Sequence, residues 1–461
     1  MPYDDVAWEK SDTTFDTWKK QLYDADTLRE IGQLIAQHRG GVPEELYAPI
    51  RGAFNVCLRM RFRDGGSALI RFPCPGVVMF PEEKVRAEVA VMRYIKHHTS
   101  IPVPFVLHYG MTDESPRGLG PFIIMEYVEH AHDLVDVLNT PGLGLQDRPV
   151  LDPNISEERL EFVYSQMADI LLQLSKCAFP RIGSLVETDD DDDDDDDRWT
   201  ITKRPLTLNM NELVQLGNFP RARLPSGTFS TSSTYYSALA DMHLEHLSTQ
   251  HNDAIESADD CRSKYIARQL FRKLASQSRL SGEHDLEAGP FRLFCDDLRP
   301  ANVLVNAEFQ IVAVLDWEFT YAAPVEFTYS PPWWLLLEMP EYWTRGLEDW
   351  ATTYERRLGT FLRVLEERER EGREKDERER GISGDSQMLL STPRKSWAFD
   401  GVFWNWLDRK FFGDENDGGG FMGRLKLLGR EEREGMEVFV QRKLEEAKER
   451  ILVGWEGDGV M

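Results

Sequence analysis

The segment from Phe294 to Asn306, FCDDLRPANVLVN, sets several polar side chains directly before an apolar run. The apolar runs NVLV and FQIVAVL, separated by NAE, predict a small antiparallel hairpin. Because the first strand of a hairpin begins beside the end of the second, we expect Asn302 next to Asp316, with Asp297 on the loop that enters the same end. Amide and carboxylate oxygens suit Mg²⁺, and a further aspartate could accept a hydroxyl proton. These residues predict a phosphoryl-transfer site.

A second pair of charged residues lies in the first quarter of the chain. Residues 55–62, NVCLRMRF, alternate apolar and polar side chains as a strand does, and after the turn RDGG the segment SALIRFP returns as a strand that carries Arg71. A helix is expected from Pro81, and its apolar face includes Glu88. A carboxylate facing a sheet needs a cation, and Arg71 is the best candidate. A solvated glutamate and an ordinary strand-end arginine are the alternative.

The elements that must position these groups predict two lobes. Two strands, a helix and the strand in GPFIIMEYVEH form a small α+β lobe, whereas helical patterns dominate from Asp133 onward. We therefore expect an N-terminal helical extension (1–46), an N-lobe (47–128) and a helical C-lobe (129–461). The nine aspartates within 187–198 predict a disordered insertion, and the charged segment 364–395 predicts an exposed helix or a solvated loop.

The composition limits the class of protein. Across 461 residues the formal net charge is −26, so the chain would repel the phosphates of nucleic acid. The five cysteines are scattered without CxxC spacing, which argues against disulfides or a zinc site. The first residues are acidic and no stretch approaches eighteen apolar residues, so neither a signal peptide nor a membrane span is expected. These features predict a cytoplasmic protein without membrane or nucleic-acid partners.

The motif CDDLRPANVLVN followed by VLDWEF resembles the aminoglycoside phosphotransferase and choline kinase group, whose usual pattern is His-Gly-Asp-Leu-His-Pro-Gly-Asn and then Asp-Trp-Glu. The segment FTYSPPWWLLLEMPEYW resembles the large fungal branch of that family, and the resemblance extends from Tyr47 to Trp343. It implies a bilobal protein-kinase-like fold of the α+β class, with a β-rich N-lobe. It also implies Mg²⁺-dependent transfer of the γ-phosphoryl group of ATP or GTP to a hydroxyl of a small molecule.

The resemblance also assigns roles to individual residues. It implies that Asp297 is the catalytic base, that Asn302 and Asp316 bind the metal, and that Glu88 is the helix glutamate that pairs with a cation. The remaining nucleotide-binding candidates are Gly52 and Asn55 in RGAFNVC, Arg71 where the family has lysine, and the backbone groups of Glu126 and Tyr127 in the hinge.

Three residues depart from the family pattern. Cys295 replaces its first histidine, Asp296 its glycine and Arg299 its second histidine. A catalytically inactive nucleotide-binding or scaffold protein is therefore the alternative to an active phosphotransferase. A protein kinase is less favoured, because no Ala-Pro-Glu segment follows the Asp-Trp-Glu motif. The acidic chain would suit a cationic acceptor such as an amino sugar or a choline-like alcohol.

Overall fold

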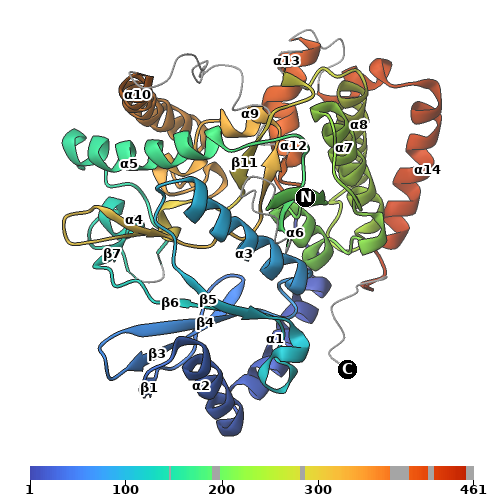
Figure 1. Ribbon diagram of the computed structural model, residues 1–461. Helices are drawn as coiled ribbons and strands as arrows, with labels where there is room; N and C mark the ends of the chain where they lie inside the picture. Colours follow the sequence, from blue (N-terminus) through green and yellow to red (C-terminus); the bar gives the residue numbers. More distant parts are fainter. Residues whose placement is uncertain (145–146, 189–197, 281–285, 374–393, 414–419, 453–461) are drawn as a thin grey trace.

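The computed structural model describes residues 1–461 except 145–146, 189–197, 281–285, 374–393, 414–419 and 453–461, and it divides the chain into two lobes (Figure 1). The smaller lobe, in blue, is built on an antiparallel sheet, and the larger lobe is mainly helical. The expected bilobal α+β class, with a β-rich N-lobe and a helical C-lobe, is confirmed.

The N-lobe sheet has six strands. They are β1 (Pro43–Leu46), β2 (Ile50–Arg51), β3 (Asn55–Phe62), β4 (Ser67–Pro73), β5 (Val106–Gly110) and β6 (Phe122–Glu126). The order is β1-β3-β4-β6-β5, with β2 also pairing with β3. The alternation of residues 55–62 gives the expected strand, whose apolar side chains are buried. Strand β5 is not among the strands expected from the sequence, and its pairing with β6 is what makes it a strand.

Three helices accompany this sheet. Helix α3 (Pro81–His98) begins at the predicted proline and places Glu88 among its buried residues. Helices α1 (Asp5–Leu22) and α2 (Ala25–Arg39) precede the sheet, and β1 then starts at Pro43, inside the stretch expected to be a helical extension. Helix α1 joins the lobes, because Trp18 packs in the core of the N-lobe while the Asp4 amide before the helix bonds to a carbonyl of the C-lobe at 2.9 Å.

The C-lobe packs helices around a large apolar core. Its longer helices are α5 (Glu157–Lys176), α6 (Leu208–Leu216), α7 (Ser232–Thr249), α8 (Ala258–Ser276), α10 (Leu347–Arg373) and α14 (Arg430–Glu446). Its short helices are α4 (Leu134–Leu138), α9 (Val325–Thr328), α12 (Phe399–Val402) and α13 (Asp408–Phe412). Helix α7 packs on α8, and α5 packs on α10.

Short strands inside the C-lobe flank the loops that contain Asp297 and Asp316. Strand β12 (Val303–Val305) pairs with β13 (Ile311–Val314) and β7 (His132–Asp133), while β11 (Phe291–Cys295) pairs with β14 (Thr320–Ala323) and β8 (Ala178–Phe179). Strands β9 (Ser184–Glu187) and β10 (Trp199–Lys203) pair with each other. The aspartate run expected to be disordered lies outside the described residues, as do residues 374–393 of the charged segment 364–395, whose first ten residues belong to α10.

Two expectations drawn from composition can be compared with the structure. All five cysteines are free thiols, as their spacing predicts. Within the described ranges, no helix combines the length and the apolar character needed to cross a membrane.

Candidate active site

The predicted hairpin brings the candidate metal-binding residues together. Strands β12 and β13 pair antiparallel, and the Leu315 amide donates to the Asn302 carbonyl at 2.7 Å, so Asn302 lies beside the end of the second strand, next to Asp316. The Asn302 Nδ2 donates to the Asp297 carbonyl at 2.8 Å and lies 3.3 Å from the Asp297 Oδ2. The hairpin prediction is confirmed, and Asp297, Asn302 and Asp316 gather at one end of it.

The turn that carries Asp316 has an unusual backbone. Asp316 and Phe319 both have left-handed backbones, with φ of 54° and 56°. This conformation strains a residue with a side chain, and in folded proteins such strain clusters at functional sites. Between them Trp317 is fully buried, and its Nε1 donates to the Val314 carbonyl at 3.0 Å. The buried indole anchors the turn, while Asp316 keeps about a third of its side chain exposed (33%).

The predicted ion pair between β4 and α3 is present. Arg71 and Glu88 form a salt bridge, with only 6% and 1% of their side chains exposed. The same guanidinium also forms a salt bridge with Asp316, so an N-lobe cation reaches a C-lobe carboxylate. Burial raises the pKa of Asp316 to about 6, even though Arg71 acts in the opposite direction.

A second buried ion pair joins the lobes, and sequence reasoning missed it. Lys84 on α3 forms a salt bridge with Glu318, and both side chains are almost fully buried. Asn55 bonds to both partners, since the Lys84 Nζ lies 2.9 Å from its Oδ1 and its Nδ2 lies 3.0 Å from the Glu318 Oε2. Burial alone would raise the pKa of Glu318, but Lys84 and Arg71 outweigh burial and lower it. The available signal was the position of Lys84, one turn before Glu88 on the same helix face.

The nucleotide-contact candidates of the N-lobe are already engaged within the protein. The Asn55 side chain is buried in the ion-pair cluster just described. The Gly52 amide donates to the Asn55 carbonyl at 2.8 Å across the turn after β2. A Cβ added at Gly52 would lie 3.5 Å from that carbonyl, an ordinary contact, so the turn does not require glycine.

The hinge candidates follow the end of β6. The Glu126 amide donates to the Phe105 carbonyl at 2.9 Å, and the Tyr127 amide donates to the Ser67 carbonyl at 3.2 Å. Both N–H groups are therefore committed to the sheet, and an adenine base would have to use other backbone groups of this segment. The predicted role of Glu126 and Tyr127 in nucleotide binding stays a prediction with that restriction.

Asp297 is the carboxylate expected to act on the acceptor. Only 13% of its side chain is exposed, and its Oδ1 lies 3.1 Å from the Arg299 Nε. Burial raises the pKa of Asp297, and the guanidinium of Arg299 partly opposes that rise. A carboxylate with a raised pKa is a better proton acceptor than an ordinary aspartate.

Cys295, which replaces a histidine of the family pattern, ends β11 directly before this loop. Its thiol lies 3.9 Å from the Asp316 carbonyl and 3.8 Å from the Glu318 carbonyl. Burial raises the pKa of this thiol, so it remains neutral. Cys295 therefore packs the Asp297 loop against the Asp316 turn through weak hydrogen bonds.

A comparison with protein families identifies the class of this chain. The model of the phosphotransferase enzyme family matches residues 61–371, which include Arg71, Glu88, Asp297, Asn302 and Asp316. The match begins within β3 and ends near the C-terminus of α10. It thus covers most of the N-lobe sheet and every residue of the hairpin site.

Two curated fungal relatives are similar to parts of the chain. The Clavispora lusitaniae protein named altered inheritance of mitochondria protein 9, mitochondrial, is 26% identical over 332 residues, which are 67% of this chain and 51% of the relative. A subtelomeric hrmA-associated cluster protein of Aspergillus fumigatus is 29% identical over 140 residues, 30% of this chain and 24% of the relative. The chain thus spans about half or less of these relatives. The expected cytoplasmic location stays a prediction, because the name of the Clavispora protein refers to mitochondria.

Solved structures that resemble this chain have a lower sequence identity to it than these relatives have. A macrolide 2'-phosphotransferase type I has a TM-score of 0.42 at 11% identity, covering 87% of this chain and 97% of its own. An ethanolamine kinase of Plasmodium vivax has a TM-score of 0.38 at 11% identity, covering 87% and 81%. The family assignment rests on the sequence match: this chain belongs to the phosphotransferase enzyme family.

Proposed function

We propose that this protein transfers the γ-phosphoryl group of ATP or GTP, with Mg²⁺, to a hydroxyl group of a small molecule. The observation that carries the proposal is the gathering of Asp297, Asn302 and Asp316 at one end of the hairpin, opposite the Arg71–Glu88 pair of the N-lobe. Membership of the phosphotransferase family supports the reaction type. A cationic acceptor would suit the acidic chain, as the sequence suggests.

The donor set at Asp316 fits a magnesium ion. Asn302 and Asp316 supply the hard oxygen atoms that Mg²⁺ prefers, and Mg²⁺ commonly completes its shell with water and phosphate oxygens. Asp316 also accepts a cation in this structure, since the Arg71 guanidinium lies on its carboxylate. Asn302 and Asp316 would hold the metal. When bound, Mg²⁺ would neutralise the negative charge on the phosphate oxygens.

The other residues act on the two substrates. The Asp297 carboxylate would orient the acceptor hydroxyl and accept its proton, and Asn302 holds the Asp297 backbone through the 2.8 Å hydrogen bond. Arg71, kept in place by Glu88, would turn from Asp316 toward the phosphates of the nucleotide. A guanidinium is broader than the ammonium usual in the family, so it would contact the phosphates through a fork of two N–H groups.

Two variants separate these roles. Asp297→Asn should leave the affinity for Mg-nucleotide close to that of the wild type and lower phosphoryl transfer by roughly 10²- to 10⁴-fold, the loss typical of a missing acid or base. Asp316→Asn removes a charged metal ligand and should weaken Mg-dependent nucleotide binding as well as turnover. Calorimetry measures binding, and the mass gain of one phosphate in a pool of hydroxylated metabolites measures transfer.

The results for the two variants and for the wild type decide between the candidate functions. An equal loss of nucleotide binding in both variants would contradict the division of roles. Normal Mg-nucleotide binding by the wild type, without transfer to any acceptor of a broad panel, would instead indicate a nucleotide-binding protein without catalysis.

A further inference from the structure

Residues 394–400, which we call the return segment, lie beyond the stretch matched by the family model and contact the loop that carries Asp297. The segment begins beside residues 296–302, the loop between β11 and β12 that carries Asp297 and that we call the catalytic loop, and it ends in α12. Its contacts include an ion pair of Arg394 with Asp296, hydrogen bonds of Ser396 with Asn209 and of Trp397 with Glu212, and an ion pair of Asp400 with Arg268. The segment thus ties the loop to α6 and α8.

The ion pair between Arg394 and Asp296 matters because the Asp296 carboxylate is buried. Only 11% of its side chain is exposed, and its Oδ2 accepts from the Leu208 amide, at the first residue of α6, at 3.0 Å. A buried carboxylate is costly unless a cation compensates it. Arg394 provides that cation, because its Nη1 lies 3.0 Å from the Asp296 Oδ1. Burial raises the pKa of Asp296, and Arg394 is the first group that opposes the rise.

The position of the Arg394 guanidinium is fixed on a second side by aromatic rings. It lies over the ring of Phe294, 4.4 Å from the centroid, and over the ring of Phe327 at 4.6 Å. Phe294 belongs to β11, the strand that leads into the catalytic loop, so the arginine contacts that strand and the loop after it. A cation held by both a carboxylate and two rings has little freedom to move.

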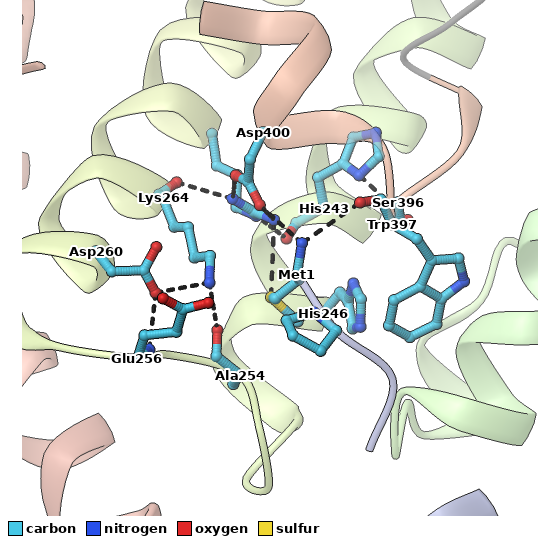
Figure 2. A network of polar contacts seen from close by, with 12 residues as sticks. Met1, His243, His246, Ala254, Glu256, Asp260, Lys264, Ser396, Trp397 and Asp400 are labelled. Atoms are coloured by element: carbon cyan, nitrogen blue, oxygen red, sulfur yellow. Dashed lines mark hydrogen bonds and ion pairs between the residues drawn. The ribbon is translucent and has the colours of Figure 1, made fainter. Parts of the chain in front are cut away.

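The far part of the return segment is anchored in the core of the C-lobe. Figure 2 shows Ser396, Trp397 and Asp400 around the C-lobe helices, with Ser396 beside His243. The Ser396 amide bonds to the Asn209 Oδ1 at 2.8 Å, and Ser396 is fully buried. Asp400 forms its ion pair with Arg268, whose side chain is also fully buried. Because these anchors are buried and bonded to α6 and α8, they hold the chain that leads to Arg394 against the core of the C-lobe.

We propose that Arg394 is a positioning residue for Asp297, and that the return segment thereby completes a catalytic loop in which aspartate stands where the family pattern has glycine. Arg394 neutralises Asp296 and so keeps the loop and the start of α6 in one arrangement. Without it, the Asp296 carboxylate would turn toward water and carry the adjoining Asp297 backbone with it. The inference rests on the proposed function, since it concerns the base of that reaction.

Kinetics on the full chain test this with the variants Arg394→Gln, Asp296→Asn and the double variant. We expect Arg394→Gln to lower kcat by about 10²-fold, the typical cost of misplacing a reacting group by roughly an ångström, with the KM for nucleotide within about twofold. The double variant should match Asp296→Asn alone to within about fivefold, because no charge is left that needs the arginine. If the kcat of the double variant is as low as that of Arg394→Gln, Asp296→Asn does not rescue the loss and the proposal is overturned.

Arg424 offers a matched control, because it forms a buried ion pair with Asp408 at 2.8 Å in the C-terminal part of the chain. Arg424→Gln should lower stability while leaving kcat per folded molecule unchanged. If Arg424→Gln and Arg394→Gln lower kcat equally, Arg394 serves stability alone and the proposal is wrong.

Hydrogen exchange gives a readout that does not need an acceptor. The Leu208 amide is bonded to Asp296, and the Asn302 amide is bonded within the loop to Arg299 at 2.9 Å. In Arg394→Gln both amides should exchange about tenfold faster than in the wild type, and in Arg424→Gln they should not. Unchanged exchange would refute the positioning role. A wild type that transfers phosphate to no acceptor would refute the proposed function, while the exchange rates still decide whether Arg394 orders the loop.

Discussion

Replacing Lys84 by methionine should destabilise the nucleotide-free protein by leaving Glu318 buried without its cation. Removing one partner of a buried ion pair typically costs about 3–5 kcal/mol. Here Lys84 is 1% and Glu318 2% exposed, so water cannot replace the lost partner. Asn55 still donates to Glu318 at 3.0 Å, which places the expected loss near the lower end, about 3 kcal/mol. Urea unfolding followed by tryptophan fluorescence measures it.

A double-mutant cycle decides whether the pair is the cause. Glu318→Gln should also cost about 3 kcal/mol, because it leaves the buried ammonium of Lys84 with only the more distant Glu88, at 3.7 Å, as a counter-ion. The double variant should cost no more than either single change, which gives a coupling energy of about 3 kcal/mol. Lys448→Met is the control, because Lys448 and Glu445 form an exposed ion pair, with 65% and 70% of their side chains exposed, and no measurable change is expected. Simple addition of the two single effects would refute the reasoning.

Two further outcomes are expected. Replacing residues 189–197 by two glycines should leave the unfolding temperature unchanged. Glu187 and Trp199 on either side already lie opposite each other in the β9–β10 pair, so a short connection can join them. A fall of many degrees in the unfolding temperature, measured by calorimetry, would contradict this. Burial and the stacked ring of His38, at 3.6 Å between centroids, lower the pKa of His108. The pKa of His108 is therefore lower in the folded protein than in the unfolded chain, so the unfolded chain takes up a proton at a higher pH. The wild type should lose stability as the pH falls below about 6.5. His108→Phe should reduce that loss between pH 7 and 5, and equal slopes of unfolding free energy against pH in both proteins would refute the assignment.

Local patterns in the sequence were sufficient for the elements of the site. The apolar runs around NAE predicted the β12–β13 hairpin, and with it the approach of Asn302 to Asp316. The helical period placed Glu88 toward the sheet, and a buried carboxylate implied the cation that Arg71 provides. These predictions succeeded because hairpin pairing and helix faces depend on residues close together in the chain. The family motif, likewise, is one continuous stretch plus a nearby Asp-Trp-Glu.

Only the tertiary structure decided how the lobes and the return segment meet. The salt bridge of Arg71 with Asp316 joins residues 245 positions apart, and that of Arg394 with Asp296 joins residues 98 positions apart. No local period relates such residues, because their contact follows from how helices and sheets pack after they have formed. Lys84 illustrates the limit. The helix face on which it lies was predictable, but its partner Glu318 is identified only by the packing of the two lobes. The two side chains are buried together there, and a buried charge requires an opposite charge.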